Sequence, residues 1–87
     1  MTRTVSIKSG AVYTGANAFD IVDQMRQADF DPPPTVRDYV IRAVARASHY
    51  FDVILRTDTQ AGTEQELAER LLAEAIVKGF AEEVTVS

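Results

Sequence analysis

The 87-residue sequence predicts a single α+β domain, residues 1–87, with a four-stranded mixed sheet and helices packed on one face. Three observations predict this fold class. Short alternating runs around a glycine near the N-terminus indicate a hairpin, three amphipathic stretches with capping residues indicate helices, and β-branched runs follow the second and third helices. A chain of this length supports one hydrophobic core. The expected order is β-β-α-α-β-α-β.

The N-terminal hairpin is predicted from two alternating runs, 5–8 and 11–14. The dipeptide between them ends in Gly10, and a two-residue loop ending in glycine is typical of a tight turn. This register places Ile7 opposite Val12.

The first helix is predicted from about Ala18 to Ala28, with Asn17 as its N-cap. Its apolar positions fall at i, i+3, i+4 and i+7, so the helix covers a core with one side only. Three prolines at 32–34 end this part of the chain, because proline lacks an amide donor and restricts the residue before it.

The second helix is predicted to begin after Thr35 and to run to about His49. Most of its apolar side chains share one face, whereas Ile41 points away from that face, among arginines. A single exposed isoleucine is ordinary on a protein surface. The alternative is that it marks a surface for partner binding. The candidate surface consists of Ile41, Arg37, Arg42 and Arg46.

The stretch 51–57 is apolar and β-branched at consecutive positions, which is typical of a strand covered on both faces. We therefore expect it at the centre of the sheet. Thr63 and Glu66 form the capping-box pattern that begins the third helix, and Gly79 is expected as its left-handed C-cap. A short last strand is predicted at 84–86. If these two strands are parallel, they and the helix between them form a right-handed crossover.

Catalytic and metal-binding residues are scarce in this sequence. It contains no cysteine and one histidine, so nucleophile-base pairs and transition-metal sites lack their usual residues. His49 is expected at the surface, near the end of the second helix. The aspartates on and after the first helix are expected as helix caps and solvated charge: Asp20, Asp23, Asp29 and Asp31. No glycine-rich phosphate loop is present. The sequence therefore predicts no catalytic residue, no metal ligand and no cofactor.

The net charge of −4 opposes binding to a phosphate backbone. Arg42 and Arg46 share a helix face, but Asp38 precedes Arg42 by one turn, so an ion ladder along the helix explains them. Glutamates concentrate in the last third of the chain, where basic residues four positions later partly neutralise them. A solvated helix face is favoured over an acidic surface for a basic partner.

No stretch has the length of a membrane span and the start lacks a signal-peptide pattern, so the expected location is the cytoplasm. The expected function is a non-enzymatic interaction or regulatory module that binds a protein partner or a second copy of itself, as a homodimer. Two alternatives stay open. One is an acidic inhibitor that mimics nucleic acid, of the type found in phages and mobile elements; the other is a small carboxylate-dependent enzyme or enzyme subunit. An exposed apolar surface would favour the interaction module. A cluster of unpaired carboxylates would favour the nucleic-acid mimic, and an aspartate-lined pocket would favour the enzyme.

Overall fold

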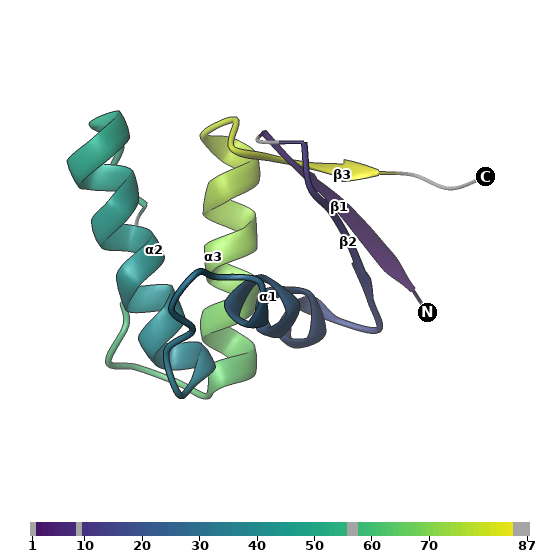
Figure 1. Cartoon of the computed structure of the whole chain (residues 1–87), viewed down its shortest axis with the longest axis horizontal. Coiled ribbons are helices and arrows are strands. Elements are labelled where there is room, and N and C mark those ends of the chain that lie inside the picture. The colour runs from purple at the N-terminus through teal and green to yellow at the C-terminus, as the bar shows by residue number, and fades with distance from the viewer. Residues whose placement is uncertain (1, 9, 56–57, 85–87) are drawn as a thin grey trace.

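The computed structural model describes residues 2–8, 10–55 and 58–84, which form a small α+β domain of three strands and three helices in the order β-β-α-α-α-β. The strands are β1 (Arg3–Ile7), β2 (Val12–Gly15) and β3 (Ala81–Val84). The helices are α1 (Ala18–Gln27), α2 (Val36–Phe51) and α3 (Glu64–Val77). Figure 1 shows all three helices on one side of the sheet. The predicted fold class and the predicted one-sided cover are confirmed.

The sheet has β1 at its centre, in the strand order β2-β1-β3, and both strand pairs are antiparallel. Val5 in the middle of β1 is completely buried and lies opposite Tyr13 on one side and Glu83 on the other. On the other face of the sheet, the hydroxyl oxygens of Thr4 and Thr14 lie 3.1 Å apart. The predicted four-stranded mixed sheet is therefore wrong in strand number and in direction.

The hairpin is shifted by one residue from its predicted register, because Ser6 rather than Ile7 lies opposite Val12. The turn is longer than predicted. The Ile7 amide donates to the Ala11 carbonyl at 2.7 Å, and the Gly10 amide donates to the Ile7 carbonyl at 2.8 Å. Gly10 has a φ of 104°, which glycine adopts without steric cost. Three residues, not two, separate the paired positions, as in hairpins that place glycine last in the loop.

Helix α1 begins as predicted and faces the core as predicted. The Asn17 side chain accepts a hydrogen bond from the Asp20 amide at 3.0 Å, which confirms Asn17 as the N-cap. Ala18, Ile21 and Val22 are buried. The 3.6-residue spacing of the apolar positions therefore produces one buried face.

Helix α2 runs to Phe51, beyond its predicted end near His49. Phe51 lies one turn after the buried Ala47, so the helical spacing of apolar residues continues into the segment predicted as a strand. Asp52 then adopts a left-handed conformation with φ 55° and ψ 38°, and the Val53 amide donates to the Ala47 carbonyl at 3.1 Å. The Asp52 amide donates to the same carbonyl, and these two hydrogen bonds end the helix.

The central strand predicted at 51–57 is absent from the described residues. Phe51 is helical, residues 53–55 belong to no helix or strand, and residues 56–57 lie outside the described part. Leu55 is buried, but Ile54 is 70% exposed. Strand propensity expresses how well side chains pack on the surface of a sheet. The described part of the segment after α2 has no neighbouring strand, and Leu55 packs in the core beside residues of α2 and α3. The predicted crossover is absent with the strand.

Helix α3 confirms the capping box. The Glu66 amide donates to the Thr63 hydroxyl oxygen at 3.2 Å, and the Thr63 amide donates to the Glu66 carboxylate at 3.2 Å. Two backbone donors at the start of the helix are thereby satisfied. The buried face of α3 consists of Leu67, Ala68, Leu71 and Leu72.

The C-terminal end of α3 turns the chain into the sheet. Gly79, with φ 84°, donates its amide to the Ile76 carbonyl at 3.2 Å, and Phe80 donates to the Ala75 carbonyl at 2.8 Å. This is the Schellman arrangement, which confirms the predicted role of Gly79. Strand β3 begins directly afterwards at Ala81, earlier than the predicted strand at 84–86, of which 85–86 lie outside the described residues.

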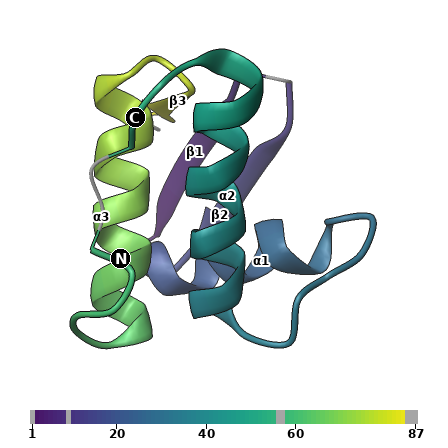
Figure 2. The same cartoon turned by 90° about the vertical axis from the view of Figure 1, so that its left-hand side faces the viewer.

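The connection between α1 and α2, residues 28–35, projects from the body of the domain (Figure 2). Pro33 in this connection is buried, and its carbonyl accepts a hydrogen bond from the Arg26 guanidinium at 3.0 Å. Because three prolines also restrict its backbone, the connection is anchored and stiff. None of the described helices has both the length and the apolar character required to cross a membrane.

Candidate functional site

An open hollow of about 170 Å³, here called the groove, is lined by residues of all three helices, of the sheet and of the segments that follow α2 and α3. Helix α3 runs alongside α2, and α1 crosses near the first half of α2 (Figures 1 and 2). The groove is lined by Ile7, Met25, Tyr39, Ala43, Arg46, Ala47, Phe51, Leu55, Leu71, Leu72, Ala75, Phe80 and Ala81. The helices and the sheet together thus form a concave surface that is mostly apolar.

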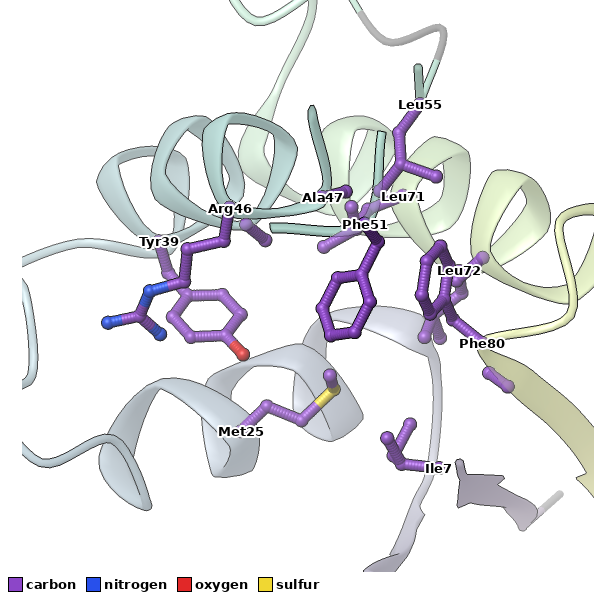
Figure 3. A pocket seen from close by; sticks show the side chains of 13 residues that line it. Ile7, Met25, Tyr39, Arg46, Ala47, Phe51, Leu55, Leu71, Leu72 and Phe80 are labelled. Atoms are coloured by element: carbon purple, nitrogen blue, oxygen red, sulfur yellow. The ribbon is translucent and has the colours of Figure 1, made fainter. Parts of the chain in front are cut away.

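Aromatic and aliphatic side chains form the walls of the groove (Figure 3). The rings of Phe51 and Phe80 meet edge to face, with centroids 5.2 Å apart. Met25 reaches toward the groove from α1, across from α2. Phe51 is nevertheless 60% exposed. The groove therefore presents apolar surface to solvent, which is typical of a binding site.

Two polar groups, from Tyr39 and Arg46, lie at one end of the groove (Figure 3). Burial raises the pKa of the Tyr39 phenol above its ordinary value, and the negative charge of Asp29 raises it further. Tyr39 is therefore a neutral phenol near pH 7 and can donate a hydrogen bond. Arg46 keeps its positive charge at the same end.

Asp29 holds Arg46 in place. Its side chain is 6% exposed, accepts two hydrogen bonds from Arg46 at 3.1 and 3.3 Å, and accepts one from Arg42 at 3.3 Å. One carboxylate between two guanidinium groups leaves a local charge of +1, and the Arg46 side chain remains 47% exposed. Two predictions are thereby wrong: Arg42 pairs with Asp29 rather than Asp38, and Asp29 is a paired carboxylate rather than solvated charge.

The ionised Asp29 carboxylate makes the free energy of unfolding depend on pH. The hydrogen bond from Arg46, above all, holds the pKa of Asp29 below its ordinary value of about 4. A carboxyl with a lowered folded-state pKa stabilises the fold above its unfolded-state pKa, and this stabilisation is lost as pH falls through the folded-state pKa. We therefore expect Asp29→Asn to lose less stability than the wild type when pH falls below about 4.

Urea unfolding between pH 7 and pH 2 measures this difference. The matched control is Asp38→Asn, because the Asp38 carboxylate is exposed and makes no hydrogen bond or ion pair with the described residues. The control should keep the acid sensitivity of the wild type. Equal acid sensitivity of Asp29→Asn and the wild type would show that the pair with Arg46 does not stabilise the fold.

The residues of the predicted partner surface fall on different parts of α2. Arg42 and Arg46 meet at Asp29, beside the groove. Arg37 lies near the start of the helix, where its guanidinium donates to the carbonyls of Thr59 at 2.7 Å and Gly62 at 2.6 Å. It therefore anchors the connection between α2 and α3. Ile41 is partly exposed and does not line the groove.

His49 is exposed in the last turn of α2, as predicted, and its ring contacts Tyr50 with centroids 4.8 Å apart. It does not line the groove. Within the described part of the chain, no three histidine or acidic side chains come together in a group that could hold a metal ion.

Several carboxylates form ion pairs with arginines. Ion pairs join Asp23 to Arg26, Glu66 to Arg70 and Glu83 to Arg3. Five carboxylates make no hydrogen bond or ion pair with described residues: Asp31, Asp38, Asp52, Glu69 and Glu82. The charge of Glu69 nevertheless acts on Arg3.

The groove was not predicted because it depends on where α2 ends and on what faces it. One signal was present: Phe51 follows Ala47 by four residues, which extends the apolar stripe of the helix. No local pattern shows that Phe80 lies against Phe51. No protein-family model, curated protein or solved structure matches the chain.

Proposed function

We propose that this domain is a non-enzymatic interaction module that binds a protein partner through the groove. The observation that carries the proposal is the open apolar groove together with the exposed side chains around it. Phe51, Tyr50 and Ile54 each leave more than half of their surface in water. Covering such surface is favourable by about 25 cal/mol per Å² of apolar area, and aromatic side chains are enriched where protein partners bind most tightly.

The chemistry of the groove supports binding rather than catalysis. Its lining contains one phenol and one guanidinium, and the other side chains are apolar. Burial keeps the phenol protonated, so it is suited to donating a hydrogen bond rather than to accepting a proton near pH 7. These two polar groups can orient a partner, while the apolar walls provide most of the affinity. The proposal places the module in the cytoplasm, as expected from the sequence.

A protein fits the groove better than a free small molecule does. A small molecule inside the groove would leave Tyr50 and Ile54 exposed, because neither residue lines it. A protein segment can fill the groove and cover these side chains in one contact. The carboxylate-dependent enzyme gains no support from the groove, since no aspartate or glutamate lines it.

Affinity purification from cells of the source organism tests the proposal with two variants of matched exposure. Phe51 at the groove is 60% exposed, and Val12 on β2 is 59% exposed. We expect a partner that is retained by the wild type and by Val12→Ser and is lost by Phe51→Ser, with affinity reduced about tenfold or more.

Circular dichroism and urea unfolding must first show that both variants fold. A set of retained proteins that is the same for Phe51→Ser and Val12→Ser would overturn the proposal. A retained protein that is this chain itself would support it, because self-association through the groove is also an interaction.

A further inference from the structure

Phe30 is a large apolar side chain that the fold leaves completely exposed. It lies in the connection between α1 and α2 that projects from the domain (Figure 2). The hydrogen bond from Arg26 to the Pro33 carbonyl and the three prolines hold this connection. A side chain presented from a stiff segment loses little conformational entropy on binding. Phe30 therefore has the properties of a preformed anchor for another molecule.

The anchor and the groove lie next to each other on the surface. Asp29, the residue before Phe30, is hydrogen-bonded to Arg46, and Arg46 lines the groove. Phe30 does not enter the groove of its own chain, since its side chain is fully exposed. The segment that carries the exposed ring and the open apolar groove are therefore neighbours.

The groove has the size that a phenyl ring requires. Its volume is about 170 Å³, and an engineered apolar cavity of about 150 Å³ in another protein binds benzene. The lining next to this space comes from Phe51, Phe80 and Met25, which are suitable neighbours for an aromatic ring.

We propose that two copies of this chain associate about a two-fold axis, with Phe30 of each copy in the groove of the other. A two-fold interface uses the same surface on both subunits. A ring and a groove side by side on one surface satisfy this requirement, because a two-fold rotation brings each ring toward the opposite groove. The inference rests on the proposed function, since it uses the same groove and names a second copy as its partner.

The charges beside the groove suit this arrangement. Asp31 follows Phe30, and its exposed carboxylate makes no hydrogen bond or ion pair with the described residues. The half-exposed guanidinium of Arg46 lies at the end of the groove. Entry of Phe30 brings Asp31 toward the Arg46 of the other copy. Asp29, Asp31, Arg42 and Arg46 together carry no net charge, so the −4 of each chain is not concentrated at this contact.

Sedimentation equilibrium over a range of protein concentrations tests the proposal. The variants are Phe30→Ala, which removes the ring, and Ala43→Phe, which fills the groove from α2. Val12→Ala is the control for loss of an exposed apolar side chain elsewhere. We expect the wild type and the control to form dimers, and each of the other two variants to dimerise about a hundredfold more weakly, because each dimer loses both ring contacts.

Mixing the two weakened variants tests the reciprocal geometry. A pair of one Phe30→Ala chain and one Ala43→Phe chain retains one ring and one open groove that match, so the mixture should associate more strongly than either variant alone. Because Phe30 is fully exposed, Phe30→Ala should leave the unfolding midpoint of the monomer unchanged. Ala75→Phe on α3 replaces Ala43→Phe if the latter lowers that midpoint.

A wild type that remains monomeric at millimolar concentration, a Phe30→Ala variant that dimerises like the wild type, or a mixture without recovery would each overturn the proposal. These outcomes are separate from the test of the function. If Phe51→Ser loses a different protein partner while the wild type is monomeric, the groove is an interaction site and a second copy is not its partner.

Discussion

Replacing Val5 with aspartate is expected to lower the free energy of unfolding by about 3–5 kcal/mol, the usual cost of an uncompensated charge in a protein interior. Val5 is completely buried at the centre of β1 and lies directly opposite Glu83. An aspartate there loses its hydration and also faces a like charge across the strands. Since native proteins are stable by only about 5–15 kcal/mol, this loss is a large fraction of the total free energy of unfolding.

The matched variant is Ile54→Asp, which tests where the centre of the sheet lies. Ile54 belongs to the segment that sequence patterns place in a central strand, yet it is 70% exposed. Its replacement should change the free energy of unfolding by no more than about 0.5 kcal/mol, as expected for a surface position. Urea unfolding followed by circular dichroism measures both variants. Equal destabilisation by the two aspartates would mean that the segment after α2 is a buried strand.

Replacing Leu71 with alanine is expected to lower the free energy of unfolding by about 2–5 kcal/mol. Leu71 is buried on α3 and forms part of the inner wall of the groove. Truncation removes apolar contacts and enlarges a space that the three surrounding helices and the sheet leave open, so the loss is not offset by collapse of the cavity.

Val77→Ala on the same helix is the control for Leu71→Ala, because Val77 is mostly exposed. It should shift the denaturation midpoint only slightly. A Leu71→Ala variant with the midpoint of the wild type would show that α3 does not pack against the core with this face. Loss of partner binding without loss of stability would instead limit Leu71 to a role in the groove.

Local features of the sequence determined the three helices and their caps, but not the end of α2 at Phe51. Asn17, Thr63, Glu66 and Gly79 have the capping roles predicted for them, because each role depends on residues within one or two helical turns. The buried faces of the helices follow from their apolar spacing in the same way. The α+β class and the N-terminal hairpin were predictable for this reason.

Contacts between distant residues decided the rest. The segment 51–57 has strand-forming residues, but β1 is paired by β2 and β3, and Phe51 continues the apolar face of α2. Strand propensity depends on the neighbours that a sheet provides, so no local pattern could decide this competition. The hairpin register depended on one extra residue in the turn, which shifts every pair along the strands.

The candidate site depends most on tertiary structure. Asp29 and Arg46 are seventeen positions apart and meet only because the connection between α1 and α2 folds back along α2. The groove exists because side chains from all three helices and from the sheet meet around it without filling it. The sequence by itself determined helix caps and apolar faces, since these are short-range interactions. The tertiary structure alone decided the central strand, the groove and the exposure of Phe30, since each depends on which distant surfaces meet and which remain uncovered.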